Sequence, residues 1–303
     1  MADSLAVFAR KLKKAYGGFE ALKGIDLNVP EGSICGLVGP NGAGKSTALK
    51  SLVGLCDAEG ELSVLGQDPR RGRAALMRDV CFVADVGVLP RNLKASEILS
   101  YVADVHPRFD RDRAFILLQE AGIDPRKRVK TLSKGMVTQL HLALIMAIDV
   151  KLLILDEPTL GLDILNRKAF YDALLSYARA GQRTLIISTH QIEEVESLLS
   201  HLVFLKQGEV VLEASLVEIN SRFAEVAVSE GNRNAAEALM PMAQWYSQTA
   251  AHYLFDANGE HPIDQATLAS LGEVSRPRVA DLFVALLSKQ ARASSNLATE
   301  GMV

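Results

Sequence analysis

The sequence has three cysteines, one tryptophan and no apolar run approaching the roughly 18 residues that a bilayer-spanning helix needs. Cys35, Cys56 and Cys81 lie inside apolar segments without metal-site spacing, so we expect reduced thiols in a cytosolic protein. The first residues lack the basic-then-apolar layout of a signal peptide. A net charge of -3 does not favour nucleic-acid binding. A chain that spans a membrane by itself is therefore not expected.

Alternating strand and helix patterns predict an α/β fold, and an apolar content of 49% is ample for its core. Residues 5–30 alternate as two strands joined at Gly17 and Gly18, which predicts an antiparallel portion. A mainly parallel sheet is predicted from strands at 34–38, 61–65, 80–84, 151–155, 184–188, 201–206 and 209–213. The intervening helical patterns lie at 70–79, 95–105, 110–121, 136–148, 163–180 and 191–199. The stretch from about 88 to 148 is expected to form a helical insertion.

One nine-residue stretch matches the phosphate-binding pattern of a glycine, four spacers and Gly-Lys-Ser/Thr. It consists of Gly39, Pro40, Asn41, Gly42, Ala43, Gly44, Lys45, Ser46 and Thr47. A predicted strand leads into it and a helical pattern leads out, which is the context that the motif requires. A glycine-rich turn that binds nothing is the alternative, and the complete match with its flanking elements argues against it.

The residue types in this stretch suit a nucleoside triphosphate. Glycines let backbone N–H groups wrap closely around phosphate oxygens, and the following helix points its positive end at the anion. Lys45 can reach the β and γ phosphates, Ser46 can ligate Mg2+, and Thr47 can bond the α phosphate. A nucleoside triphosphate bound together with Mg2+ is therefore expected.

Further polar residues follow the ends of two predicted strands. Asp156 can hold Mg2+ and Glu157 can polarise an attacking water, although two acids in a turn are common in structural roles. His190 can contact the γ phosphate, although a lone histidine at a strand end is more often structural. An aromatic side chain at Tyr16 can stack on a nucleobase or simply pack in its strand. The phosphate-binding stretch favours the functional interpretation of Asp156, Glu157 and His190, whereas both interpretations of Tyr16 stay open at this point.

Five motifs in this order resemble those of the ATP-binding subunits of ABC transporters. They are the phosphate loop, Leu132-Ser-Lys-Gly-Met136, Leu152 to Pro158, Gly161-Leu-Asp163 and Ser188-Thr-His190. The resemblance covers residues 5–215 and implies a P-loop NTPase of the ABC ATPase type. Residues 127–136 resemble the ABC-2-type exporter branch, which includes antibiotic and multidrug systems.

The resemblance implies roles that spacing alone does not. Tyr16 would stack on adenine, Ser133 and Gly135 would contact the γ phosphate held by the opposite subunit, and Asp163 would connect the two ATP sites. The protein would be a homodimer, or a heterodimer with a similar subunit. It would bind a separately encoded membrane permease through helices 95–121, on the cytoplasmic face of the membrane, and power export.

Two positions depart from the family pattern. Lys134 and Met136 replace the first Gly and the Gln of the usual Leu-Ser-Gly-Gly-Gln signature, while Ser133 and Gly135 are kept. Asp85 stands where the family usually has a glutamine, and its carboxylate can still hold Mg2+ through water. We therefore expect a working site.

Two other classes of protein also contain a phosphate loop of this kind. A soluble ABC-type ATPase acting on ribosomes or DNA would have two ATPase units or long coiled coils, and neither is present. A GTPase would have an Asn-Lys-x-Asp sequence, which is also missing. Residues 1–215 are thus expected to form the nucleotide-binding domain. Residues 216–290 would be a small α+β accessory domain, and residues 291–303 a disordered tail.

Overall fold

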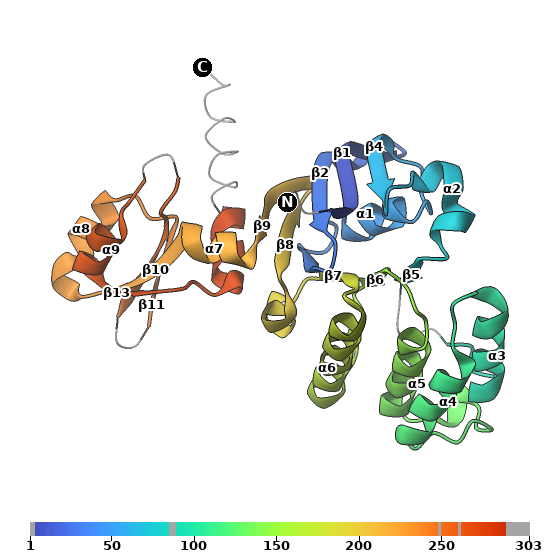
Figure 1. Ribbon diagram of the computed structural model, residues 1–303. Coiled ribbons are helices and arrows are strands. Elements are labelled where there is room, and N and C mark those ends of the chain that lie inside the picture. Colours follow the sequence, from blue (N-terminus) through green and yellow to red (C-terminus); the bar gives the residue numbers. More distant parts are fainter. Residues whose placement is uncertain (1–3, 85–88, 248–249, 260–261, 289–303) are drawn as a thin grey trace. The chain divides into compact units, whose positions relative to one another are not determined.

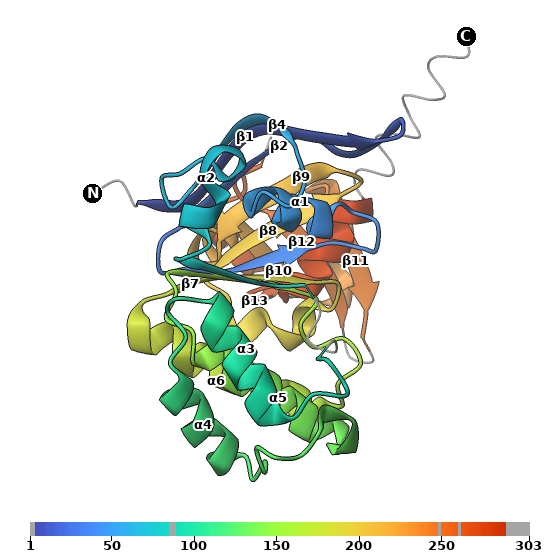
Figure 2. The ribbon, with the colours of Figure 1, turned by 90° about the vertical axis from the view of Figure 1, so that its right-hand side faces the viewer.

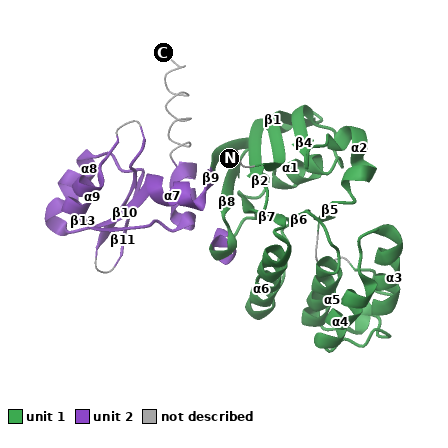
Figure 3. Ribbon diagram, in the orientation of Figure 1, with its two compact units in different colours: residues 1–191, 197–213 green, residues 192–196, 214–303 purple. Residues whose placement is uncertain are grey.

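The structure is a computed structural model that describes residues 4–84, 89–247, 250–259 and 262–288. The chain divides into two compact units (Figure 3). Unit 1 comprises residues 1–191 and 197–213, and unit 2 comprises residues 192–196 and 214–303. No helix in the described part of the chain combines the length and apolar character needed to cross a bilayer.

Unit 1 begins with a three-stranded antiparallel sheet, of which the alternation of residues 5–30 predicts two strands. Its strand order is β2 (Phe19–Pro30), β1 (Leu5–Tyr16), β4 (Glu59–Val64). The third strand was predicted at 61–65 as part of the mainly parallel sheet, but it pairs antiparallel with β1 instead. Gly17 and Gly18 form the turn between β1 and β2 with φ of 53° and 91°, a backbone region that glycine enters without strain. This turn places the end of β1 beside the start of β2.

The main sheet of unit 1 has six strands in the order β5-β6-β7-β3-β8-β9. Their bounds are β3 (Ile34–Val38), β5 (Val80–Val83), β6 (Leu152–Asp156), β7 (Thr184–Thr189), β8 (His201–Lys206) and β9 (Glu209–Ser215). The pairs from β5 through β8 are parallel, and every residue of β3, β6 and β7 is buried. Because these three strands are neighbours, their carboxyl ends meet at one edge, where ligands bind in open α/β sheets.

Helices cover both faces of this sheet. The short sheet and α1 (Lys45–Leu52) lie on one side, and α6 (Ile164–Gly181) and the helical insertion lie on the other (Figures 1 and 2). The insertion has its own core and contains α3 (Ala95–Val105), α4 (Arg111–Glu120), the short η1 (Val129–Thr131) and α5 (Lys134–Met146). The short helix α2 (Pro69–Leu76) follows β4.

The prediction of a helix at 191–199 is wrong. Two short 3-10 helices, η2 (Ile192–Glu194) and η3 (Glu196–Leu198), stand there instead. Ile192 and Val195 are buried at i, i+3 spacing, which a 3-10 turn aligns on one face. Three glutamates within residues 193–196 would repel one another on a continuous helix.

Unit 2 has an antiparallel sheet in the order β11-β12-β10-β13. The strands are β10 (Phe223–Val228), β11 (Ala243–Tyr246), β12 (Ala251–Asp256) and β13 (Gly272–Ser275). The helices are α7 (Leu216–Arg222), η4 (Glu230–Asn232), α8 (Arg233–Ala238), α9 (Gln265–Leu271) and one over residues 279–288. The sequence pattern predicts strands at 222–229 and 251–256 and helices at 234–240 and 278–290, which correspond to β10, β12, α8 and the last helix. It does not predict β11, β13, α7 or α9. The tail expected at 291–303 lies outside the described residues.

Candidate active site

The phosphate loop runs from the end of β3 into α1 and depends on glycine at two close approaches. A Cβ atom at Gly39 would lie 2.3 Å from the carbonyl oxygen of Leu205. One at Gly44 would lie 2.5 Å from that of Ala21, and Gly44 also caps α1 with φ of 107°. Any side chain at either position would push the loop away from its neighbours, so the sequence at these positions fixes the loop's path.

Lys45 is held in the loop by its side chain. Its ammonium Nζ donates hydrogen bonds to the carbonyl oxygens of Gly39 at 2.7 Å and Pro40 at 3.3 Å. The same Nζ lies 3.2 Å from Oε1 of Glu157, and Lys45 is only 6% exposed. A buried ammonium with these acceptors is fixed in place at the centre of the loop.

Glu157 follows β6 in a strained backbone conformation. Its φ is 48°, a left-handed value that is uncommon for a residue other than glycine. Its N–H donates to Oγ of Ser188 at 2.9 Å, and its Oε2 lies 2.8 Å from Nδ1 of His190. The strain is thus offset by contacts with the neighbouring strand β7, and it aims the carboxylate at Lys45 and His190.

Asp156 is the last residue of β6 and is 6% exposed. Its Oδ1 accepts a hydrogen bond from Oγ of Ser188 at 2.6 Å. Ser188 therefore binds the side chain of Asp156 and the backbone of Glu157 at once. The parallel register, which pairs Asp156 with Ser188, makes this bridge possible.

A cavity of about 290 Å³ opens over the loop. Its walls are Tyr16, Phe19, Ala21, residues 41–47 and Glu157. The structure thus gathers Tyr16, most of the phosphate loop and Glu157 around one space. Phe19, which pairs with Tyr16 across the hairpin and is 66% exposed, was not predicted as a site residue. The available signal in the sequence was an aromatic residue directly after Gly17 and Gly18.

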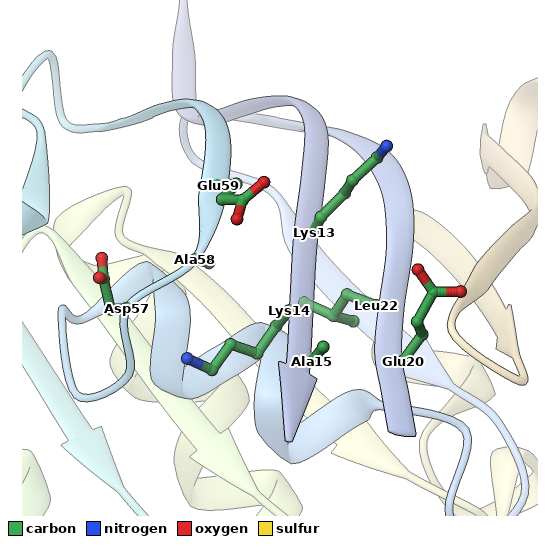
Figure 4. Close-up of a pocket in the computed structure, with 8 residues that line it drawn as sticks. All are labelled: Lys13, Lys14, Ala15, Glu20, Leu22, Asp57, Ala58 and Glu59. Atoms are coloured by element: carbon green, nitrogen blue, oxygen red, sulfur yellow. The ribbon is translucent and has the colours of Figure 1, made fainter. Parts of the chain in front are cut away.

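Tyr16 lies at the end of β1 and is 47% exposed. Nζ of Lys14 lies 5.1 Å from the centre of the Tyr16 ring. Burial, together with the nearby side chain of Cys56, raises the pKa of the Tyr16 hydroxyl. A second cavity, of about 270 Å³, lies beside this strand end, and Figure 4 shows Lys14 extending from β1 toward Asp57. The ring of Tyr16 therefore has a neutral hydroxyl and a cationic neighbour.

Ser133 and Gly135 do not line the cavity but stand at the start of α5. Oγ of Ser133 caps this helix by accepting from the N–H of Met136 at 3.2 Å. A Cβ atom on Gly135 would lie 3.0 Å from Oδ1 of Asn166. The carboxylate of Asp163, the cap of α6, accepts hydrogen bonds from the backbone N–H and from the side-chain Nδ2 of Asn166. The bond from the backbone N–H lowers the pKa of Asp163. The starts of α5 and α6 are thus in contact.

The side chains at the strand ends suit Mg2+ bound together with a nucleotide. Among the described residues, no group of three or more His, Cys, Asp or Glu side chains could hold a metal ion. Mg2+ is usually bound by one or two protein oxygens plus substrate phosphates and water, so such a group is not required. Asp156 has one carboxylate oxygen outside its bond to Ser188, and the Ser46 hydroxyl belongs to the phosphate loop. Asp85 lies outside the described residues.

The sequence is similar to those of known transporter proteins. A family model described as "ABC transporter" matches residues 22–160. The daunorubicin/doxorubicin resistance ATP-binding protein DrrA of Streptomyces peucetius is 32% identical over 71% of this chain and 67% of that protein. The lantibiotic transport ATP-binding protein SrtF of Streptococcus pyogenes is 33% identical over 67% of this chain and 88% of that protein.

Solved structures show the same fold. A dimeric ATP-binding cassette in a post-hydrolysis state, bound to ADP and Pi, superposes with a TM-score of 0.60 at 25% identity. The match covers 69% of this chain and 98% of that one. The fold described above therefore recurs in a cassette that was solved with ADP and Pi bound.

Proposed function

The chain belongs to the ABC transporter family and is an ATP-hydrolysing subunit of a transporter, and on that premise we propose that it powers export through a separate membrane permease. The observation that carries this proposal is the contact of Lys45 and His190 with the single carboxylate of Glu157, beside the nucleotide cavity. Export is supported by the similarity to drug-resistance and lantibiotic transport subunits. Residues 1–215 are assigned the ATPase role.

Nucleotide binding uses the loop and the aromatic strand end. The backbone N–H groups of the phosphate loop, other than at Pro40, and the Lys45 ammonium bind the phosphates, with Thr47 at the α phosphate. Tyr16 stacks on adenine, and Phe19 extends the aromatic wall of the same cavity. Ser46 and Asp156 hold the Mg2+ that accompanies ATP, and Asp85 is the third proposed ligand. The ion supplies neutralisation of the charge on the β and γ phosphates.

Hydrolysis is assigned to Glu157 as general base. The oxygen of a water molecule bonds to the γ phosphorus, and the bond to the β–γ bridging oxygen breaks, which leaves ADP and phosphate. The carboxylate of Glu157 takes the proton of that water. His190 orients this carboxylate through its Nδ1 contact and contacts the γ phosphate. His190 thus holds the base in one orientation.

The site is completed by a second subunit, either another copy of this chain or a similar ATPase subunit. Ser133 and Gly135 lie away from the cavity of their own chain, on the exposed start of α5. They are free to meet the γ phosphate bound by the opposite subunit, with Asp163 between the two sites. Binding of two ATP molecules closes the dimer, and hydrolysis reopens it.

Copurification with its membrane partner tests this proposal. We expect an affinity-tagged chain to extract a polytopic membrane protein from solubilised membranes and no nucleic acid, as befits a subunit on the cytoplasmic face. ATP hydrolysis by the pair should depend on Glu157. Recovery of ribosomal RNA or DNA in place of a membrane protein would overturn the assignment.

A further inference from the structure

Unit 2 contains a groove of about 630 Å³ in which the ATPase machinery takes no part. One wall runs from the end of α8 through β11, and the other is the helix over residues 279–288 (purple in Figure 3). Small-molecule sites typically measure about 300–1,000 Å³, are mostly apolar and have a few placed polar groups. The groove has the size of such a site, and its lining mixes apolar side chains with polar ones.

Apolar side chains are presented to the groove at some conformational cost. Val284 is 61% exposed in the groove, whereas Val279 and Leu282 of the same helix are buried in unit 2. Met240 is 68% exposed and has φ of 51°, just after α8, where glycine would be free of strain. Met242 lines the same wall. Flexible methionine side chains adapt to ligands of different shapes.

The groove also contains a tryptophan whose ring is held in place. Trp245 stacks on His252 with ring centres 5.8 Å apart and an angle of 7° between the planes. Nδ1 of His252 lies 2.8 Å from Oε1 of Glu225, and its Nε2 lies 3.1 Å from Oγ of Ser247. Both imidazole nitrogens are therefore bonded, which fixes the surface against which the indole packs. An indole is the aromatic ring that attracts cations best.

Among the described residues that line the groove, the ionisable ones are two carboxylic acids, Glu237 and Asp281. Oε1 of Glu237 accepts a hydrogen bond from the Tyr253 hydroxyl at 3.3 Å. Oδ2 of Asp281 accepts from Nε of Arg278 at 2.8 Å, and that arginine is 74% exposed. The ion pair with this exposed arginine offsets only part of the negative charge of the Asp281 carboxylate at the groove. The groove therefore combines negative charge, an indole and apolar walls.

We propose that this groove binds a hydrophobic organic cation. The positive charge lies between Glu237 and Asp281 and against the indole of Trp245. The apolar body packs on Met240, Met242 and Val284. A hydrophobic anion of the same shape gains the apolar contacts but meets two like charges, so charge sign is the discriminating feature.

The chain's single tryptophan makes the test direct, because fluorescence of the full-length protein reports on Trp245 alone. The protein is titrated with tetraphenylphosphonium and, separately, with tetraphenylborate, which has the same shape and opposite charge. We expect saturable binding of the phosphonium, at least tenfold tighter than that of the borate, and calorimetry should give the same affinity. The combined variant Glu237→Gln, Asp281→Asn should lose at least tenfold in phosphonium affinity.

Matched variants distinguish binding in the groove from non-specific hydrophobic binding and from binding at the ATPase site. Glu230→Gln with Glu273→Gln removes two exposed carboxylates of unit 2 outside the groove and should bind as the parent does. Val284→Lys places a cation at an exposed groove position and should abolish binding without unfolding the protein. Lys45→Ala should leave phosphonium binding unchanged. Equal binding of the borate, or parental affinity in the groove variants, would overturn the proposal.

Discussion

Nζ of Lys45 lies 3.2 Å from Oε1 of Glu157, so the lysine of the phosphate loop and the carboxylate after β6 form an ion pair. The pair is largely shielded, with side chains 6% and 22% exposed. A phosphate that takes the ammonium therefore competes with Glu157 for it. In the proposed mechanism, this exchange would free the carboxylate to accept a proton once the nucleotide is in place.

Lys45→Ala should abolish tight ATP binding. The variant loses a charge-assisted contact with the phosphates, each such contact being worth about 2 kcal/mol, or roughly 30-fold in affinity. Calorimetric titration with MgATP measures the loss. Lys50→Ala, which removes an exposed lysine from the same helix, is the matched control and should bind normally. Parental affinity in Lys45→Ala would remove this residue from the phosphate site.

Glu157→Gln should keep ATP binding and lose turnover by roughly 10²- to 10⁴-fold, the usual contribution of a general base. A glutamine keeps the shape of the side chain but cannot take the proton. Phosphate release measures the rate, and size-exclusion chromatography with MgATP should reveal a trapped dimer. Turnover at the parental rate would show that another group is the base.

Ser188→Ala should destabilise the folded protein by about 1–3 kcal/mol, because the Glu157 N–H would lose its acceptor and Asp156 its donor. The left-handed backbone of Glu157 would also be less restrained, so turnover should fall as well. Denaturant unfolding measures the stability. Ser176→Ala, at an exposed position of α6, should leave both quantities near their parental values.

Much of unit 1 could be predicted from its sequence because its motifs combine strong local signals. Fully apolar strands end at Val38 and Asp156, and Ser133 and Asp163 precede helices as caps. The contacts among Lys45, Glu157 and His190 could not be predicted, since they depend on strand register and on the unusual φ of Glu157. No local pattern encodes either feature.

Unit 2 was harder to predict because its elements are short and mixed in polarity. β11 and β13 have four residues each, too few for an alternating pattern to stand out. β13 begins at Gly272, a residue type that is depleted in strands. Its strand position follows from pairing with Val228 rather than from its own preference.

Two cysteines should make the protein less stable at alkaline pH. Burial raises the pKa of Cys81 from 9.0 to about 12 and raises that of Cys35 as well. Below pH 9 both thiols are protonated in the folded and in the unfolded protein. As pH rises from 9 toward 12 the unfolded chain loses them first, so unfolding becomes easier by up to about 1.4 kcal/mol per pH unit for each thiol.

Unfolding free energies measured from pH 8 to 11 test this dependence. The combined variant Cys35→Ala, Cys81→Ala should have a flatter profile than the parent over that interval. Cys56→Ala should keep the parental slope. A slope that is the same in all three proteins would assign the alkaline loss to other groups.

Gly135→Ala should lower ATP turnover although alanine favours a helix by about 1 kcal/mol. The added Cβ would lie 3.0 Å from Oδ1 and 3.2 Å from Nδ2 of Asn166. Asn166 cannot retreat freely, because its Nδ2 donates to Asp163 at 2.6 Å. The start of α5, with Ser133, would therefore be displaced from the position proposed to meet the opposite nucleotide.

Asn166→Ala removes the obstructing side chain and should restore turnover to the Gly135→Ala protein. Turnover in the two single variants and the double variant forms a cycle that measures this coupling. If the contact transmits the defect, the double variant should be more active than Gly135→Ala alone. If Asn166→Ala gives no rescue, the methyl group acts directly at the nucleotide, and the contact between α5 and α6 is not what positions Ser133.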